Sequence, residues 1–357
     1  MRPVTERMRV LVAMRGGVDS SLAAALLHAA GHEVIGVTLH LWDASGSDKV
    51  GRCCAPEDRE DARRTCDLLG VPHYVLDERK AFRTHVVDPF VHTNLAGRTP
   101  IPCVACNQQV KLARLWQVAQ SFGAERVATG HYARLRVNDA GGVELLRGRD
   151  LQKDQSYFLF GVGQAVLSHM LFPLGELHKP EARELARQHG LSNWDKPDSQ
   201  ELCFVPDQDV RGFVERQAGR AADSGEIVDT SGQVLGQHRG ITGFTIGQRR
   251  GLGIPGREPK YVLKIIVDTR QVVVGSAQEL AVAELRAQDV TWTSMRPAAP
   301  FEAQLRIRSR HTPADCIVTP TAEGFTARFI QPESAVAPGQ AAVVYAGERV
   351  VGGGYIV

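Results

Sequence analysis

Met8–Ser21, MRVLVAMRGGVDSS, is the stretch that decides the fold. Its first half is mostly apolar, which favours a short buried strand over Met8–Met14. Two glycines follow, and an Ala- and Leu-rich run over Ser20–Ala30 then ends at Gly31, as helices often do. A strand, a glycine turn and a helix in this order predict one unit of a parallel α/β sheet.

The same alternation continues through the first 200 or so residues. Strand-like and helix-like patterns follow one another at Val34–Leu41 (strand), Pro56–Leu69 (helix), Tyr74–Leu76 (strand), Arg79–Leu95 (helix), Gln108–Phe122 (helix) and Arg126–Thr129 (strand). Strands that alternate with helices predict a parallel sheet covered on both faces.

Beyond about residue 205 the pattern changes to short β-branched runs separated by turn residues. They are Glu226–Val228, Gly243–Ile246, Tyr261–Val267, Gln271–Val274, Ala303–Ile307, Cys316–Thr319, Phe325–Phe329, Ala342–Tyr345 and Val350–Val357. Closely spaced strands of this kind predict small β-barrels or sandwiches. We therefore expect three domains: α/β over residues 1–204, small and mostly β over 205–283, and β-barrel-like over 284–357.

Length and composition agree with this division and exclude several classes of protein. The chain has 357 residues, and roughly 150 residues per domain permits two or three domains. Apolar residues make up 43% and charged residues 23%, which excludes a largely disordered chain. No apolar run approaches the roughly 18 residues of a membrane span, and the N-terminus lacks a secretory pattern. We expect a cytoplasmic monomer that does not enter a membrane.

The junction at Arg15–Ser21 is suited to binding an anion. A strand–glycine–helix turn directs backbone N–H groups and the positive end of a helix toward one point. The hydroxyls of Ser20 and Ser21 can add donors. The alternative is a tight turn in which Asp19 and Ser20 only cap the helix. The loop is not a Walker A loop, because it lacks Gly-Lys-Ser/Thr.

Seven cysteines, without a secretory pattern, favour thiol or metal chemistry over a disulfide framework. Cys103 and Cys106 form a single CxxC, which we expect in a loop just before a helix. This places Cys106 close to the helix N-terminus, where a thiolate is stabilised. This pair is either functional, half of a zinc site, or two ordinary thiols. Cys203 follows in Asp198–Val205, DSQELCFV. We interpret the remaining cysteines as ordinary residues: Cys53, Cys54, Cys66 and Cys316.

The net charge of +2 gives no argument for a nucleic-acid partner, so any such partner needs local basic patches. One patch contains Arg239, Arg249, Arg250, Arg257, Lys260 and Lys264, opposed only by Glu258. A second contains Arg306, Arg308 and Arg310, which we expect on one face of a strand, followed by His311. Such patches suit phosphate contacts or form a solvated face.

The loop resembles the PP-loop of the ATP pyrophosphatase superfamily, Ser-Gly-Gly-x-Asp-Ser, except that Arg15 stands in place of the first Ser. Five further motifs occur in the order seen in bacterial tRNA-specific 2-thiouridylases, over essentially the whole chain. These are Cys106-Asn107, Ala128–Tyr132 (ATGHY), Lys153–Ser156 (KDQS), the Cys203 segment and Gly243–Gly253 (GFTIGQRRGLG). The resemblance implies an adenine nucleotide alpha hydrolase-like first domain.

The resemblance also implies a reaction. ATP adenylates the C2 oxygen of the wobble uridine of tRNA, and sulfur then replaces that oxygen with release of AMP. Cys203 carries a persulfide received from an upstream sulfur carrier or cysteine desulfurase, and Cys106 is the second catalytic thiol. The two can end as a Cys106–Cys203 disulfide. Asp19 serves the nucleotide, through Mg²⁺ or by ordering the loop.

Individual site residues follow from the same resemblance. ATP is expected to contact Ala13, Met14, Arg15, Gly16, Gly17, Val18, Asp19, Ser20, Ser21, Leu39 and Gly130. We expect tRNA to contact Ile101, Pro102 and Cys103 near the target base, then Lys153, Asp154, Gln155, Arg308 and Ser309. Ser309 falls where the family usually has Tyr, and we expect Arg15 to lower the affinity for ATP. His131 and Asp198 are either polar site residues or structural.

Cys103 opens a second route for the sulfur, because many family members have Asp at this position. Three thiolates from Cys103, Cys106 and Cys203 could hold a [4Fe-4S] cluster and leave one iron open for hydrosulfide. Two other functions stay open as well. One is a PP-loop enzyme that adenylates a small metabolite for amidation, and the other is a non-catalytic RNA-binding protein whose loop does not use ATP.

Overall fold

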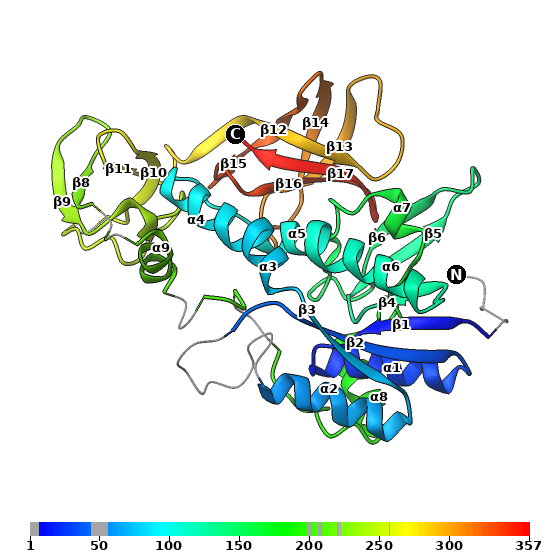
Figure 1. Ribbon diagram of the computed structural model, residues 1–357. Coiled ribbons are helices and arrows are strands. Elements are labelled where there is room, and N and C mark those ends of the chain that lie inside the picture. The colour runs from blue at the N-terminus through cyan, green and yellow to red at the C-terminus, as the bar shows by residue number, and fades with distance from the viewer. Residues whose placement is uncertain are drawn as a thin grey trace.

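The computed structural model describes residues 7–43, 56–198, 202–205, 209–219, 221, 223–256 and 258–357. Cys53, Cys54, Arg257 and residues 199–201 of the Cys203 motif lie outside these ranges. The described chain forms a five-stranded parallel sheet, a four-stranded mixed sheet and an eight-stranded antiparallel sheet (Figure 1). The predicted succession of an α/β unit and two β units is confirmed. No helix of the described ranges has the length and apolar character needed to cross a bilayer.

The parallel sheet has the strand order β3-β2-β1-β4-β7, all strands parallel. Its strands are β1 (Arg9–Ala13), β2 (Glu33–His40), β3 (His73–Asp77), β4 (Arg126–Ala128) and β7 (Met170–Leu171). The helices around it are α1 (Val18–Ala29), α2 (Pro56–Leu69), α3 (Arg79–Phe82), α4 (Asp88–Leu95), α5 (Pro102–Ala105), α6 (Leu112–Ser121), α7 (Gln164–Leu167) and α8 (Lys179–Gln188).

Both faces of this sheet are covered, as the alternation of strands and helices predicts. Val10 and Val12 of β1 pack into one core with α1, α2 and α8. Leu11, between them, packs into a second core with α6 and with residues of the C-terminal barrel. Figure 1 shows the resulting layers, with α1, α2 and α8 below the sheet and α3–α6 between the sheet and the barrel. The first domain and the barrel therefore share one core.

Two helical segments of the first domain contain π-helical turns. The first, η1 (Arg83–Val87), joins α3 to α4 within the predicted helix Arg79–Leu95. The second, η2 (Cys106–Lys111), joins α5 to α6. The helical segment predicted over Gln108–Phe122 therefore begins six residues earlier, at Pro102. The prediction that Cys103 and Cys106 lie in a loop before the helix was wrong, because both cysteines are helical.

The central sheet has the order β10-β11-β8-β9, with helix α9 (Val210–Ala218) before it. Its strands are β8 (Gly225–Val228), β9 (Val234–His238), β10 (Tyr261–Ile266) and β11 (Gln271–Gly275). The predicted strand Gly243–Ile246 is absent: Ile241–Gly243 form a 3₁₀ turn, η5, and the next residues lie in a loop. Its β-branched residues therefore pack without pairing in a sheet.

Six strands of the third sheet close into a barrel, because β12 (Ala281–Trp292) pairs with both β15 and β17. The other strands are β13 (Phe301–Arg306), β14 (Ala314–Thr321), β15 (Gly324–Ser334), β16 (Ala341–Ala346) and β17 (Arg349–Ile356). The closure requires glycine: a Cβ on Gly352 or Gly354 would lie 2.7 or 2.6 Å from a carbonyl oxygen of β12. A hairpin of the first domain, β5 (Ala133–Val137) and β6 (Val143–Arg147), extends the sheet from β17.

Candidate active site

Gly16 and Gly17 connect β1 to α1 and make the predicted loop an open cradle. Gly16 has φ of 68°, and a Cβ there would lie 1.9 Å from the carbonyl oxygen of Asp58. Gly17 is the N-cap of α1, and a Cβ on it would meet nothing within 4 Å. The first N–H groups of a helix have no partner within it. The space above Gly17 is therefore where an anion can approach them.

The serine hydroxyls act inside the loop and are not available as the extra donors we expected. Ser20 Oγ donates to the Gly17 carbonyl and accepts from the Arg15 N–H, both at 3.1 Å. Ser21 is fully buried, and its Oγ accepts from Thr65 and Asn193. Among the described residues no side chain caps α1, so Asp19 and Ser20 are not the caps that the tight-turn interpretation requires.

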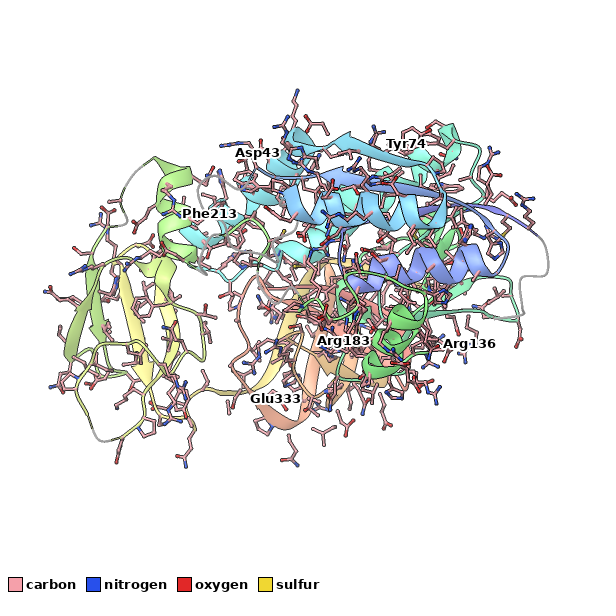
Figure 2. All side chains as sticks on the ribbon, turned by 90° about the horizontal axis from the view of Figure 1, so that it is seen from below. Asp43, Tyr74, Arg136, Arg183, Phe213 and Glu333 are labelled. Atoms are coloured by element: carbon pink, nitrogen blue, oxygen red, sulfur yellow. The ribbon has the colours of Figure 1, made fainter. Side chains whose placement is uncertain are left out.

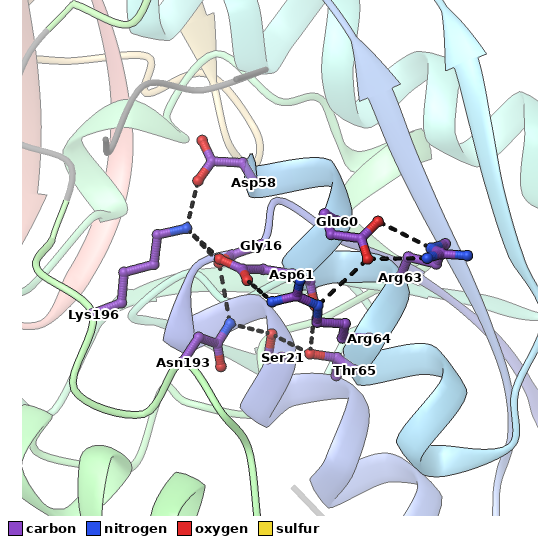
Figure 3. A network of polar contacts seen from close by, with 10 residues as sticks. All are labelled: Gly16, Ser21, Asp58, Glu60, Asp61, Arg63, Arg64, Thr65, Asn193 and Lys196. Carbon is purple, nitrogen blue, oxygen red and sulfur yellow. Dashed lines mark hydrogen bonds and ion pairs between the residues drawn. The ribbon is translucent and has the colours of Figure 1, made fainter. Parts of the chain in front are cut away.

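A second set of contacts attaches the loop to α2 and to the segment that follows α8 (Figure 3). The Gly16 carbonyl accepts from Asn193 Nδ2 at 3.1 Å and from Lys196 Nζ at 3.2 Å. Lys196 Nζ also lies 2.6 Å from Asp58 Oδ1 and 2.6 Å from Asp61 Oδ2, both on α2. Burial works to lower the pKa of Lys196, but the two carboxylates outweigh it and raise this pKa. The ammonium is thus charged and fixes the loop to α2.

Asp19, in the first turn of α1, belongs to a network of ion pairs. Its Oδ1 accepts from the Tyr132 hydroxyl at 3.0 Å and from Lys179 Nζ at 2.7 Å. Lys179 Nζ lies 2.9 Å from Asp198 Oδ1 as well. In the described part of the chain no three His, Cys, Asp or Glu side chains are grouped to hold a metal ion. The contacts with Lys179 and Tyr132 fit Asp19 as a residue that orders the loop.

The remaining residues expected to contact ATP surround the loop. Ala13 ends β1 and Met14 follows it; Met14 is buried, and its N–H donates to the carbonyl oxygen of Val37. Gly130 lies directly against the loop, since a Cβ on it would be 2.6 to 2.8 Å from backbone atoms of Asp19 and Ser20. Leu39 is half-buried near the end of β2, and Arg15 is exposed. These positions are compatible with the expected contacts.

Two basic side chains, Lys111 and Arg15, lie close enough to His131 to affect its pKa. Burial first, and then the charges of Lys111 and Arg15, lower the pKa of His131 to about 3. Thr129 Oγ1 lies 2.7 Å from Nδ1 of this neutral imidazole. Lys111 and Arg15 therefore bring positive charge to the region in which a polyphosphate would lie.

Cys106 and Cys203 lie in one apolar cluster although 97 positions separate them. Cys106 is 4% exposed, and Cys203 packs half-buried against the same group of side chains. Phe82, Phe90, Phe204 and Phe213 dominate this group; Figure 2 labels Phe213, which comes from α9. Leu39 packs against it too. The cluster therefore contains both predicted thiols together with Leu39 and Leu41, at the carboxyl end of β2.

Cys103 does not join the other two thiols. It is exposed on α5, whereas Cys106 is buried. Cys103, Cys106 and Cys203 therefore do not form the expected ligand set of a [4Fe-4S] cluster in the described chain, which contains no group of metal ligands. The described cysteines form no disulfide bond.

The segment Lys153–Gln155 is held by hydrogen bonds and ion pairs to residues outside it. Asp154 is buried, and its carboxylate accepts from the N–H groups of Gly148 and Ser156 and from Arg306 Nη1 at 2.7 Å. Gln155 Oε1 accepts from the Tyr132 N–H. Lys153 and Gln155 are half-buried, and 38% of the Lys153 side chain is exposed.

The predicted arginine face on the barrel was wrong. Arg306 ends β13 and is buried, while Arg308 and Arg310 lie in the following turn. The Arg306 guanidinium donates to the carbonyl oxygen of Ser309 as well as to Asp154. Arg306 thereby joins the two predicted tRNA-contacting segments, and Arg308 remains exposed. Ile101 and Pro102 are buried, and Gln340 Nε2 of the barrel donates to the carbonyl groups of Thr99 and Pro100 just before them.

Three residues of the site escaped the sequence analysis: Lys179, Asn193 and Lys196. Lys179 opens α8, whose start is marked in the sequence by Pro180 and by Glu181, which bonds back to His178. That signal places a helix but not the reach of a lysine side chain. Their partners in the loop, on α1 and on α2 are 135 to 180 residues away along the chain, at a separation that no local pattern encodes.

Comparisons with known proteins agree with this geometry. Three family models match in order: the tRNA methyl transferase HUP domain at residues 8–207, the tRNA methyl transferase PRC-barrel domain at 211–276 and the aminomethyltransferase beta-barrel domain at 282–356. The tRNA-specific 2-thiouridylase MnmA of Sorangium cellulosum is 49% identical over 98% of this chain and 92% of its own length. That of Geobacter metallireducens is 48% identical over 98% and 97%.

A third relative, from Koribacter versatilis, carries the same name and is 46% identical over 97% of this chain and 98% of its own length. Sequence identity of this size, over nearly the full length of all these chains, shows that they belong to one family. The chain belongs to the tRNA-specific 2-thiouridylase MnmA family.

Proposed function

We propose that this protein catalyses the ATP-dependent 2-thiolation of the wobble uridine of tRNA. The observation that carries the proposal is the apolar cluster that holds Cys106 and Cys203 at the end of β2. The cluster lies beside the glycine cradle, because β2 pairs in parallel with β1 and both strands end at the same edge of the sheet. An activating site and two thiols thus occupy one edge, where α/β sheets bind ligands.

In the proposed reaction each residue has a distinct task. ATP phosphates approach the α1 N-terminus above Gly17, and Asp19, held by Lys179 and Tyr132, keeps the loop in place. The uridine O2 attacks the α-phosphate and pyrophosphate leaves, which converts a poor leaving group into AMP. Mg²⁺, when bound together with ATP, would neutralise part of the phosphate charge.

Sulfur transfer follows by a balanced exchange. The terminal sulfur of a Cys203 persulfide attacks C2 of the uridine and expels AMP. The Cys106 thiolate then attacks Cys203 Sγ, so that a Cys106–Cys203 disulfide forms and the sulfur stays on the base. A dithiol reductant must restore both thiols. The apolar surroundings of the cluster exclude water that would hydrolyse the adenylated base.

We also propose the division of labour between domains and partners. Residues 1–204 form the catalytic domain, 205–283 the central domain and 284–357 the barrel that helps to bind tRNA. The tRNA contacts Lys153 on the first domain and Arg308 and Ser309 on the barrel. An upstream sulfur carrier or cysteine desulfurase delivers the persulfide sulfur to Cys203. The protein acts as a monomer in the cytoplasm, where its substrate is found.

Incubation with ATP, unmodified tRNA and a persulfide donor tests the proposal. Formation of 2-thiouridine at the wobble position is expected, together with ATP–pyrophosphate exchange that depends on tRNA. Exchange that needs a small metabolite in place of tRNA would favour an amidating PP-loop enzyme. Tight tRNA binding without any exchange would leave a non-catalytic RNA-binding protein.

The two loop glycines provide the first mutational prediction. Gly16→Ala should destabilise the fold by about 2 kcal/mol or more, because the new Cβ collides with Asp58 at a positive φ. Gly17→Ala should change stability by less than ~1 kcal/mol but weaken an ATP analogue at least tenfold, since its methyl group enters the open cradle. Thermal unfolding and calorimetric titration measure the two effects. An undiminished affinity of Gly17→Ala would contradict this location of the phosphates.

Arg15 provides the second prediction. Arg15→Ser should bind an ATP analogue several-fold more tightly, because a small hydroxyl can donate to a phosphate where the arginine side chain is bulky; a hydrogen bond to a charged group is worth about 1.5–3 kcal/mol. The loss of one positive charge reduces this gain. Arg15→Ala separates the two effects, since it removes the charge and the bulk without supplying a donor. Equal affinities of Arg15→Ser and the wild type, by calorimetry, would refute the prediction.

A further inference from the structure

Four charged side chains form a continuous row from the nucleotide loop to the segment that carries Lys153. Lys179 Nζ lies 2.7 Å from Asp19 Oδ1 and 2.9 Å from Asp198 Oδ1. The other carboxylate oxygen of Asp198 lies 2.8 Å from Lys153 Nζ. The charges alternate along the row: Asp19, Lys179, Asp198, Lys153. The row thus connects a residue of the proposed phosphate site to a residue of a proposed tRNA-contacting segment.

The two ends of the row are partly exposed, Lys179 is buried, and Asp198 lies between these extremes with 23% of its side chain exposed. The side chains of Asp19 and Lys153 are 32% and 38% exposed, whereas that of Lys179 is 8% exposed. Charges in a buried, less polarisable environment interact more strongly than charges in water. A change in the field at one open end is therefore transmitted through Lys179 with little screening by solvent.

Neighbouring groups fix the row in place without completing it. The backbone N–H of Lys179 donates to Asp150 Oδ2 at 3.0 Å. Arg183, one turn further along α8 and labelled in Figure 2, donates to Asp198 Oδ1 at 3.2 Å and to the carbonyl oxygens of Trp194 and Lys196. Lys179 is the member that contacts the carboxylates of both Asp19 and Asp198, so its ammonium is the link between the two halves.

We propose that nucleotide and tRNA bind with negative coupling through this row, and that Lys179 is the positioning residue that carries it. The inference rests on the proposed function for the identity of the two ligands. Phosphates at the α1 N-terminus attract Lys179 and so weaken its bond to Asp198. Asp198 then holds Lys153 more tightly, and Lys153 becomes less available to an RNA phosphate. In the reverse direction, RNA that withdraws Lys153 leaves Asp198 to draw Lys179 away from the loop.

The coupling is measured as the ratio of two dissociation constants. The Kd of unmodified tRNA is determined without nucleotide and with a saturating non-hydrolysable ATP analogue, at one ionic strength. The Kd of the analogue is then determined without and with tRNA. The wild type should show a several-fold weakening, and linkage requires the same factor in both directions.

Variants separate the row from the simple repulsion between two anions. Lys179→Met should lose most of the coupling factor, and Lys179→Arg should retain much of it. Lys196→Met is the matched control: Lys196 is also a well-buried lysine, 13% exposed, bound to two carboxylates and to the loop, but these carboxylates lie on α2. It should weaken nucleotide binding and keep the wild-type factor.

Lys153→Met breaks the row at its solvent end, so it should remove the factor even if Lys179→Met does not fold. Thermal unfolding of each variant establishes which of them are folded. Wild-type protein that binds both ligands without coupling would overturn the inference, as would an unchanged factor in a folded Lys179→Met or in Lys153→Met. A wild type that fails to bind tRNA or nucleotide would instead contradict the proposed function.

Discussion

Cys203→Ser is expected to abolish 2-thiouridine formation, by at least a factor of about 10³, while tRNA-dependent ATP–pyrophosphate exchange continues. A hydroxyl cannot carry a persulfide, so the variant has no sulfur to deliver to the activated base. The exchange reaction reports adenylation alone, and adenylation uses the loop at Gly16–Asp19 and neither thiol. Mass spectrometry of digested tRNA measures the product, and radiolabelled pyrophosphate measures the exchange.

Cys106→Ser should fail at a later point. The persulfide sulfur of Cys203 can still attack C2 and release AMP, but no second thiolate is present to detach the sulfur from Cys203. A covalent complex of protein and tRNA, joined through the Cys203 persulfide sulfur, should therefore accumulate in this variant. Dithiothreitol should cleave this linkage. Cys66→Ser is the control, because Cys66 is fully buried in the core on the other side of the sheet and burial raises the pKa of its thiol to about 12. Substantial thiolation by Cys203→Ser would overturn the proposed sulfur route.

The fold could be predicted largely because its signals are local. The run Met8–Met14, the glycine turn and the Ala-rich helix determine one another within about twenty residues, and the structure confirms them as β1 and α1. The β5–β6 hairpin was missed although its own pairing is local, and only its attachment to β17 depends on residues some 200 positions further along the chain. Gly243–Ile246 has the composition of a strand, but its first residue ends the 3₁₀ turn η5 and the segment does not pair in a sheet. Pairing depends on which strands are neighbours in space, and the local sequence does not reveal this.

Site residues could be predicted where their role depends on residue type within a local motif. They could not be predicted where the role depends on which distant side chains they contact in the fold. Cys106 and Cys203 were identified by their motifs, and the shared apolar cluster agrees with their pairing. Lys179 was missed, because nothing in the neighbourhood of a helix start reveals contact with Asp19 on another helix. Arg306 was assigned to a solvent-facing stripe by its alternation with Arg308, yet its side chain turns inward to meet Asp154.

This buried pair leads to the second large effect. Arg306→Met should lower the free energy of unfolding by about 3–5 kcal/mol, because it leaves the Asp154 carboxylate buried without its cation. The side chains are only 8% and 1% exposed, so water cannot replace the lost partner. The guanidinium also lies 5.4 Å from the ring centre of Tyr157 and 5.9 Å from that of Tyr345, which adds to the loss. Chemical denaturation monitored by tryptophan fluorescence measures the change.

Arg308→Met separates stability from binding, since Arg308 is exposed two residues further on. Its free energy of unfolding should lie within about 0.5 kcal/mol of that of the wild type. Its affinity for tRNA should be lower and should depend less on salt concentration. Adding Asp154→Asn to Arg306→Met should recover part of the lost stability, because the uncompensated charge is then removed. Equal stabilities of Arg306→Met and Arg308→Met would mean that the pair does not hold the barrel to the first domain. The link between the two segments proposed to contact tRNA would then have to lie in their shared apolar core instead.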